Sequence, residues 1–159
     1  TNTTGTTIAQ YAVGAGGGGP RGPSGLSLFK PPYSRITAID LNTGEHLWMI
    51  PVGETPDRIK NNPALAGIDI GNTGTGAHAP MTVTKNMLMY ASQASDGTPH
   101  LFAVDKATGR QIGKVQVPAN SRYGMMTFVH KGEQYVILQT GSTLTAMNLH
   151  GPVASGGGH

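Results

Sequence analysis

Two polar loops carry the side chains best suited to chemistry. The first runs over residues 71–79 and reads Gly-Asn-Thr-Gly-Thr-Gly-Ala-His-Ala; the second runs over 120–124 and contains Arg122. Glycines let backbone N–H groups approach carboxylate or carbonyl oxygens closely. His78 can donate to a bound ligand, and the guanidinium of Arg122 suits a carboxylate. The alternatives are a glycine-rich surface loop, a solvated or turn-capping histidine and a solvent-facing arginine.

Other chemistries have little support in the sequence. The chain contains no cysteine, which excludes disulfide scaffolds and thiolate metal sites, and its six histidines are too dispersed for a zinc ligand set. The run Gly14–Gly19 superficially matches a dinucleotide-binding fingerprint, but no helical pattern follows it and Pro20 interrupts it. The stretch Asp40–Gly44 begins like a calcium loop, yet glycine stands at a ligand position and no bidentate glutamate follows. A tight turn is the better interpretation.

An internal repeat must position the two loops. The stretch Ala38–Gly44, which leads to Trp48, reads Ala-Ile-Asp-Leu-Asn-Thr-Gly and recurs as Ala-Val-Asp-Lys-Ala-Thr-Gly at Ala103–Gly109, with a shorter echo at Ala146–Asn148. Each copy is typical of a strand, a tight turn and a second strand, because apolar and β-branched residues precede turn formers. The aspartate can accept backbone N–H bonds across the turn, and the glycine can adopt a positive φ. Repetition of this kind indicates a propeller or a solenoid.

Hairpins precede the second and third copies of the repeat. Apolar runs flank Lys85-Asn86 and Lys131-Gly132, and such two-residue polar turns predict hairpins. A hairpin followed by a repeat gives four antiparallel strands, which is the blade of a β-propeller. We therefore expect an all-β fold of about two and a half four-stranded blades. Strands three and four of one blade fall at 36–52, all four of the next at about 80–117, and three of a last blade at about 125–149.

This interpretation also divides the chain and implies a partner. We expect a glycine-rich lead-in or loop at 1–24, propeller blades at 25–149 with an insert loop at about 53–79, and a flexible tail at 150–159. Glycine and proline account for 24 and 11 of the 159 residues and only 37% are hydrophobic, so the chain is poorly equipped for a core of its own. An incomplete set of blades exposes strand edges, which soluble proteins avoid. The remaining propeller blades or a larger partner chain should therefore complete the structure.

The charge of the chain gives no sign of a nucleic-acid partner. The net charge is +3 at pH 7, and the lysines and arginines are scattered along the sequence. A nucleic-acid-binding protein has a clustered basic face. We therefore expect no nucleic-acid binding.

The sequence strongly resembles the C-terminal region of quinoprotein dehydrogenases of the membrane glucose dehydrogenase type. The most specific piece is Lys30-Pro31-Pro32-Tyr33, which leads into the first repeat. The resemblance covers roughly residues 20–149 and continues through Gly53-Glu54-Thr55-Pro56, Asn62-Pro63-Ala64-Leu65, Ala103–Gly109, Tyr123–Phe128 and Lys131–Val136. It implies an eight-bladed propeller with pyrroloquinoline quinone (PQQ) and calcium on its axis. It further implies a periplasmic enzyme that oxidises sugars or alcohols and passes electrons to a quinone or cytochrome acceptor.

The resemblance implies structural roles for the repeat. In this family the pattern Ala-x-Asp-x-x-x-Gly-x-x-x-Trp is a tryptophan-docking motif, in which the indole packs between neighbouring blades. It assigns structural docking to Ala38, Asp40, Gly44, Trp48, Ala103, Asp105 and Gly109. A large flat side chain with one N–H donor suits such a junction. Gly113 stands at the tryptophan position of the second copy, which should weaken that junction.

The resemblance also implies cofactor contacts. The first polar loop occupies the place from which related quinoproteins contact the quinone. The expected cofactor-binding residues are Thr75, Gly76, Ala77, His78 and Arg122. No position in the chain matches the family's general base, its calcium ligands or its quinone-contacting lysine, so we expect the catalytic and metal-binding residues elsewhere in the protein.

Two alternatives to the enzyme stay open. The loop after the Gln-Tyr-Val strand is shortened at 139–143, which leaves the substrate undetermined. The chain could be a non-catalytic propeller scaffold or an accessory subunit. The Lys30–Tyr33 lead-in and the Asn62-Pro63 insert favour the enzyme, because a bare scaffold repeat needs neither.

Overall fold

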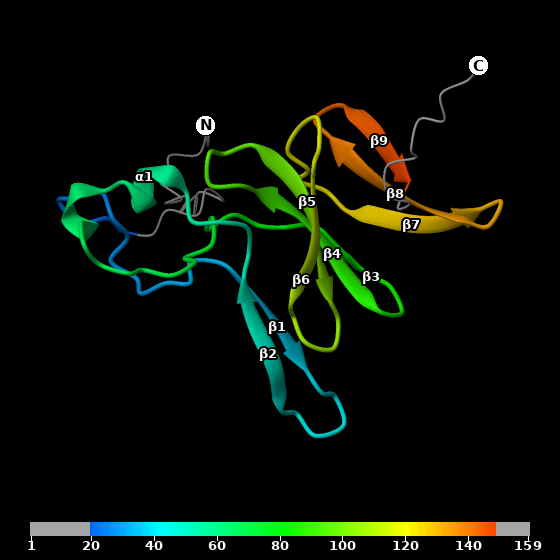
Figure 1. Ribbon diagram of the computed structural model, residues 1–159, viewed down its shortest axis with the longest axis horizontal. Helices are drawn as coiled ribbons and strands as arrows, with labels where there is room; N and C mark the ends of the chain where they lie inside the picture. The colour runs from blue at the N-terminus through cyan, green and yellow to red at the C-terminus, as the bar shows by residue number, and fades with distance from the viewer. Residues whose placement is uncertain (1–19, 149–159) are drawn as a thin grey trace, which may run out of the picture.

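The strands form three antiparallel sheets that fan out beside one another (Figure 1). The computed structural model describes residues 20–148. The first sheet contains β1 (Arg35–Ile39) and β2 (His46–Pro51), and the second contains β3 (Met81–Val83), β4 (Met87–Gln93), β5 (Pro99–Asp105) and β6 (Gln111–Gln116). The third contains β7 (Met125–His130), β8 (Glu133–Thr140) and β9 (Thr143–Asn148). Strands that follow one another within a sheet are also paired in it.

The predicted all-β fold is confirmed. A two-stranded, a four-stranded and a three-stranded sheet lie where the sequence predicts the end of one blade, a whole blade and most of another. The expected tail at 150–159 and most of the expected lead-in at 1–24 lie outside the described residues, so the division into domains stays a prediction. The short third copy of the repeat, Ala146–Asn148, forms the end of β9. The turn that would follow it lies outside the described residues.

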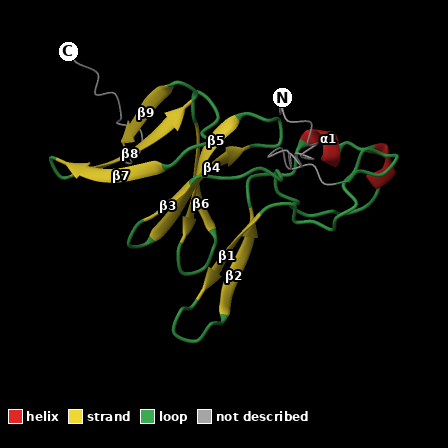
Figure 2. Cartoon of the chain, turned by 180° about the vertical axis from the view of Figure 1, so that it is seen from behind, coloured by secondary structure: helices red, strands yellow, loops and turns green. Residues whose placement is uncertain are grey.

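Within residues 20–148, helix occurs only in the insert between the first two sheets. The insert contains the single turn α1 (Asp57–Lys60) and a 3₁₀ turn at Pro63–Leu65. Figure 2 shows both on the side of the molecule away from β7–β9. Neither helix, among the residues that the structure describes, has the length and apolar character needed to cross a membrane.

The two full copies of the repeat share one strand register. Ala38 of β1 pairs with Trp48 of β2, and Ala103 of β5 pairs with Gly113 of β6. In both hairpins the register shifts at the next residue. Gly113 therefore occupies the place in the second sheet that Trp48 occupies in the first.

The turns of the two copies are also alike. The N–H groups of Gly44 and Gly109 donate to the carbonyl oxygens of Asp40 and Asp105 at 2.7 and 2.8 Å. The two glycines have φ values of +76° and +71°, a conformation that a residue with a Cβ adopts only at a cost. The Asp105 carboxylate also accepts hydrogen bonds from the Thr108 hydroxyl at 2.8 Å and the Thr108 N–H at 2.9 Å. Both bonds lower the pKa of Asp105, and the bond from the Thr108 hydroxyl contributes most to this shift.

Each face of the second sheet packs against a neighbouring sheet. Because side chains alternate between faces along a strand, Tyr90 and Phe102 point toward β1 and β2 while Met89 and Leu101 point toward the third sheet. The rings of Tyr90 and Phe102 are stacked with centroids 5.0 Å apart. On the other side the partners are fully buried aliphatic residues of β8, Val136 and Leu138. Sheet against sheet, with an apolar layer between, is how propeller blades pack.

The outward faces of the first and third sheets are apolar but exposed. On the first sheet the exposed side chains are Ile39, Leu47 and Met49, and on the third they are Met126, Phe128 and Leu144. An antiparallel sheet that faces water normally carries polar residues on that side. Both outer faces therefore have the composition of buried surfaces.

Candidate functional site

The two polar loops open at the same end of neighbouring sheets. Residues 71–79 lead into β3 and residues 120–124 lead into β7, and these two strands contact each other. The ends of adjacent first strands therefore bring both loops to one edge of the fan.

The middle of the first loop is fixed by the fold. Thr73 is 1% exposed, its N–H donates to the Thr55 hydroxyl at 2.8 Å, and its carbonyl oxygen accepts from the Tyr33 N–H at 2.8 Å. Gly74 has a φ of +68°, and a Cβ there would lie 2.9 Å from the carbonyl oxygen of Ser34. Only glycine fits this position without a backbone shift. The loop is therefore held rigidly up to residue 76.

The N–H groups of this loop already have partners. Those of Gly74, Thr75 and Gly76 donate to the Asn72 side chain, the Val52 carbonyl and the Ser34 hydroxyl, at 2.9, 2.9 and 3.0 Å. The Ala77 N–H donates to the Thr75 hydroxyl at 3.2 Å. These N–H groups hold the loop in place, and their contact with a ligand stays a prediction. The side chains of Thr75 and His78 are the other groups of the loop that could reach a ligand.

The expected cofactor residues differ in their exposure and in the loop that carries them. Thr75 and Gly76 are half-buried and line a pocket, whereas Ala77 and His78 are exposed at the end of the loop. The His78 side chain makes no hydrogen bond within residues 20–148. Arg122 is exposed in the second loop, next to the buried Ser121, and does not line the pocket that Thr75 and Gly76 line. The first four residues thus form one segment, and Arg122 is separate from them.

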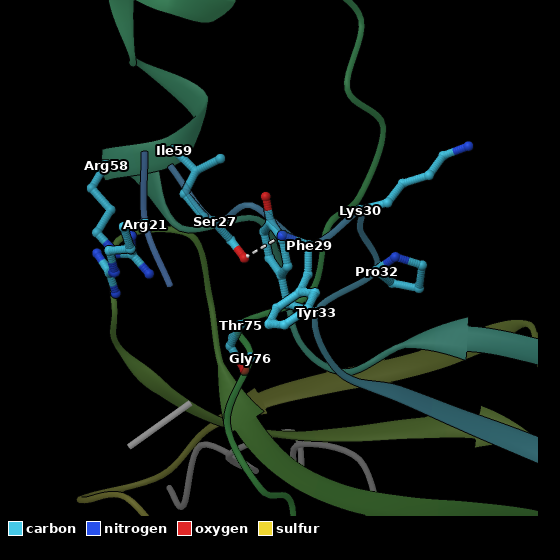
Figure 3. Close-up of a pocket in the computed structure, with 10 residues that line it drawn as sticks. All are labelled: Arg21, Ser27, Phe29, Lys30, Pro32, Tyr33, Arg58, Ile59, Thr75 and Gly76. Carbon is cyan, nitrogen blue, oxygen red and sulfur yellow. Dashed lines mark hydrogen bonds between the residues drawn. The ribbon is translucent and has the colours of Figure 1, made fainter. Parts of the chain in front are cut away.

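The pocket beside the loop has a volume of about 300 Å³ (Figure 3). Its walls come from the lead-in and the insert as well as the loop. They are formed by Arg21, Ser27, Phe29, Lys30, Pro32, Tyr33, Arg58, Ile59, Thr75 and Gly76. Sequence reasoning missed this pocket, because Arg21 and Arg58 meet only when two separate segments fold together.

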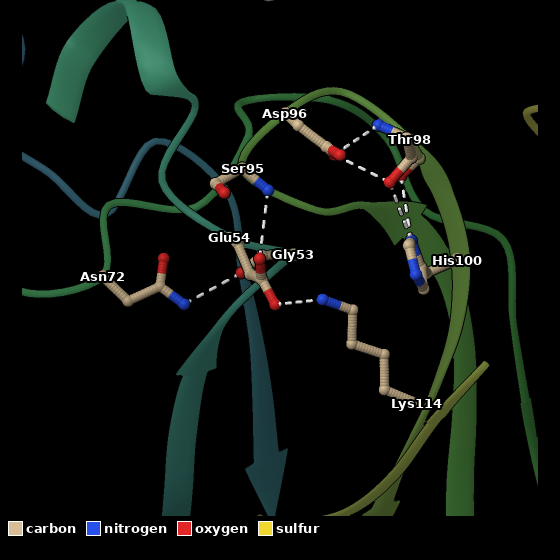
Figure 4. A network of polar contacts seen from close by, with 8 residues as sticks. All are labelled: Gly53, Glu54, Asn72, Ser95, Asp96, Thr98, His100 and Lys114. Atoms are coloured by element: carbon tan, nitrogen blue, oxygen red, sulfur yellow. Dashed lines mark hydrogen bonds and ion pairs between the residues drawn. The ribbon is translucent and has the colours of Figure 1, made fainter. Parts of the chain in front are cut away.

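A polar network ties the base of the insert to the second sheet (Figure 4). The Glu54 carboxylate lies 2.6 Å from Lys114 Nζ on β6 and accepts a hydrogen bond from the Ser95 N–H at 3.0 Å. The hydrogen bond from Lys114, more than any other contact, lowers the pKa of Glu54. The Asn72 side chain donates to the Gly53 carbonyl at 2.9 Å and so links the loop to the same network.

Trp48 joins the first sheet to the second. Its indole N–H donates to the Lys106 carbonyl at 3.0 Å, and a Cβ on Gly109 would lie 2.8 Å from the indole ring. The indole thus covers the turn of the second repeat.

Residues 20–148 contain no group of three or more His, Cys, Asp or Glu side chains that could hold a metal ion. These residues alone therefore provide no carboxylate cluster for calcium. PQQ is a different case, because its quinone oxygens and carboxylates are acceptors. The hydroxyl of Thr75, the imidazole of His78 and the guanidinium of Arg122 are donors of the matching chemistry. The donor set fits PQQ.

Comparison with known proteins gives one consistent result. Residues 4–136 match the PQQ family described as glucose/ethanol/alcohol dehydrogenase, beta-propeller domain. The chain is 31% identical over 129 residues to a probable quinate dehydrogenase (quinone) of Xanthomonas campestris pv. juglandis, with 74% of the chain covered. It is 27% identical over 119 residues to quinoprotein glucose dehydrogenase A of Acinetobacter calcoaceticus (75% covered) and 30% identical over 122 residues to a glycerol dehydrogenase large subunit of Gluconobacter thailandicus (74% covered). The aligned stretches are 15%, 14% and 16% of the lengths of these relatives.

Proposed function

The chain belongs to the PQQ family of glucose, ethanol and alcohol dehydrogenase β-propellers, and on that premise we propose that it is the C-terminal blade segment of a PQQ-dependent dehydrogenase. The whole enzyme oxidises a sugar or another alcohol. The single observation that carries the proposal is the anchored loop at 71–79, which presents free side-chain donors at the entry to the first strand of a complete blade.

The ends of the chain's sheets support its place in a larger propeller. The outward faces of the first and third sheets are apolar. The turn at Gly44 matches the turn at Gly109. Trp48 covers Gly109, whereas nothing in the described part of the chain lies within 4 Å of a Cβ built on Gly44. We propose that a tryptophan of a preceding blade covers Gly44, as the tryptophan-docking motif of an eight-bladed ring requires.

The chain's own residues would bind and orient the cofactor. Bound PQQ supplies the quinone that accepts two electrons and two protons from an alcohol. His78 and Thr75 would donate to its oxygens, and Arg122 would pair with a carboxylate. The N–H groups of Thr73, Thr75 and Gly76 donate to Thr55, Val52 and Ser34, and these bonds hold the part of the loop that carries Thr75 and leads to His78.

The remaining elements of the proposal lie outside this chain. The general base and the calcium ligands belong to other blades, and the electron acceptor is a quinone or a cytochrome. The enzyme works in the periplasm.

The test is reconstitution of the complete protein that contains this chain. Purified apoprotein is titrated with PQQ in the presence and absence of calcium, and bound cofactor is measured by equilibrium dialysis. We expect saturable binding of one PQQ per chain, followed by reduction of an artificial electron acceptor when an alcohol is added. Failure to bind PQQ under both conditions would leave the non-catalytic scaffold as the better assignment.

A further inference from the structure

We propose that the pocket between the lead-in and the insert binds a carboxylate of the substrate, so that the substrate is a hydroxy acid rather than a neutral sugar or alcohol. The inference rests on the proposed function, because the pocket adjoins the loop assigned to the cofactor. It names a ligand chemistry for Arg21 and Arg58, two residues of the pocket that the cofactor assignment does not use.

Two arginines converge on this pocket. Arg21 comes from the lead-in and Arg58 from α1, and Figure 3 shows their side chains gathered on the same side of the pocket. Lys30 lines the pocket too, but its side chain extends away on the opposite side. At about 300 Å³ the pocket is at the lower end of the range for small-ligand sites.

The two guanidinium groups have no counter-charge. Within residues 20–148 the Lys114–Glu54 contact is the sole ion pair, and no aspartate or glutamate lines the pocket. Arg58 makes no side-chain hydrogen bond in that range, and Arg21 makes one long bond of 3.5 Å to the Gly25 carbonyl. Two like charges on one side of a pocket repel each other. A carboxylate between them would relieve the repulsion and receive the paired N–H donors that guanidinium groups offer.

Local structure holds both arginines in position. In the lead-in, the Leu28 N–H donates to the Pro20 carbonyl at 2.9 Å, and Arg21 and Ser27 form a β-bridge. In the insert, Ile59 is 4% exposed and anchors the turn that carries Arg58. The Asn62 side chain donates to the Ser24 carbonyl at 3.0 Å and joins the two segments. These contacts fix the two backbone segments that carry Arg21 and Arg58, while the two side chains themselves are exposed and can turn toward a ligand.

The cofactor loop forms another wall of the pocket, below the arginines in the view of Figure 3. Thr75 and Gly76 line it, and their N–H groups are fixed to Val52 and Ser34. A hydroxy acid held by its carboxylate at the arginines would turn its hydroxyl-bearing carbons toward this loop. In the oxidation the C–OH carbon becomes C=O, its two electrons and two protons pass to the cofactor's quinone, and the carboxylate is unchanged.

The experiment measures ligand binding to the complete apoprotein by isothermal titration. The probes are D-gluconate, D-glucose and inorganic phosphate. Gluconate and glucose share most of their hydroxyl groups, but gluconate carries a carboxylate. The variants are Arg21→Gln and Arg58→Gln, with Lys85→Gln as the matched control, because Lys85 is an exposed cation on the β3–β4 turn.

We expect gluconate to bind at least about tenfold more tightly than glucose, as charge-assisted hydrogen bonds predict. Each arginine variant should weaken gluconate binding about tenfold with an unchanged thermal midpoint, and Lys85→Gln should bind normally. Equal binding of gluconate and glucose would overturn the proposal, and so would normal gluconate binding by both arginine variants. Phosphate that binds as tightly as gluconate would reduce the pocket to a general oxyanion site and overturn it as well.

The same protein separates this proposal from the proposed function. Saturation with PQQ should leave gluconate binding intact, whereas its loss would assign the arginines to the cofactor's carboxylates and contradict the inference. Gluconate binding without any PQQ uptake would contradict the proposed dehydrogenase function and support the hydroxy-acid site. PQQ uptake without gluconate binding would support the dehydrogenase function and contradict the hydroxy-acid site.

Discussion

The ring of Trp48 fills the space in which a side chain at Gly109 would lie. A Cβ on Gly109 would come within 2.8 Å of the indole Cδ2 atom, and the indole N–H donates to the Lys106 carbonyl in the same turn. The first sheet thus packs on the turn of the second sheet through Trp48 and Gly109. The junction explains why the turn of the second copy has glycine at position 109.

The variant Gly109→Ala should destabilise the protein by about 2–4 kcal/mol, because it adds a clash with the indole to the cost of a positive φ. The matched control is Gly97→Ala, since Gly97 has a φ of +86° and nothing within 4 Å of its Cβ position. It should cost about 1 kcal/mol. Urea denaturation of both variants measures the difference. Equal losses would show that the indole does not constrain residue 109.

In a Trp48→Ala background, Gly109→Ala should cost less free energy of unfolding than in the wild type. With the indole gone, the added methyl group meets open space, and only the conformational cost of about 1 kcal/mol remains. A double-mutant cycle on the free energy of unfolding gives this coupling. Strict additivity of the two substitutions would contradict the packing described for this junction.

The fold could be predicted in detail from the sequence because its signals are local. The turns at Asp40–Gly44 and Asp105–Gly109 and the polar pairs Lys85-Asn86 and Lys131-Gly132 mark hairpins whose strands the structure places within one or two residues of expectation. The Glu54–Lys114 contact gave no such signal. It joins residues 60 positions apart, and only the packing of the insert on β6 brings them together.

The Glu54 carboxylate should contribute to the free energy of unfolding at neutral pH but not in acid. The pKa of Glu54 is lower in the folded protein than its ordinary value of 4.5. A carboxyl of this kind adds stability above its unfolded pKa, and that stability is lost as the pH falls through the folded pKa. Since both partners are partly exposed, Glu54→Gln should cost less than about 1 kcal/mol at neutral pH.

The measurement for Glu54 is denaturation of wild type and Glu54→Gln at about pH 7 and about pH 3. The two proteins should differ at the higher pH and converge at the lower one. A difference that persists in acid would show that the substitution acts through packing and not through the ion pair.

Less of the candidate site than of the fold could be predicted from the sequence. The sequence pointed to the loop at 71–79 and to its glycines as a place where a ligand could come close, and the structure adds that Gly74 serves close backbone packing against Ser34. Glycine-rich loops of both kinds look alike in a sequence, because the residue that a glycine approaches lies far along the chain. Arg21 and Arg58 carried no motif at all, and their convergence depends on the tertiary fold.

His78 should matter for the cofactor and not for the fold. Its side chain is exposed and makes no hydrogen bond in the described part of the chain. His78→Ala should therefore leave the thermal midpoint of the complete apoprotein unchanged. It should weaken PQQ binding about tenfold, which corresponds to the loss of one hydrogen bond to a charged group. Equilibrium dialysis measures the affinity. Unchanged PQQ affinity would remove His78 from the site.

The central claim is that these sheets form an arc whose outer faces are covered by further blades, and Gly44→Ala in the complete protein tests it most directly. Gly44 has the turn conformation of Gly109, but nothing in the described chain lies within 4 Å of its Cβ position. If a preceding blade covers that turn with an indole, Gly44→Ala should lower the free energy of unfolding by about 2–4 kcal/mol, as much as Gly109→Ala. A loss of only about 1 kcal/mol, equal to that of Gly97→Ala, would mean that the turn is uncovered and would contradict the account.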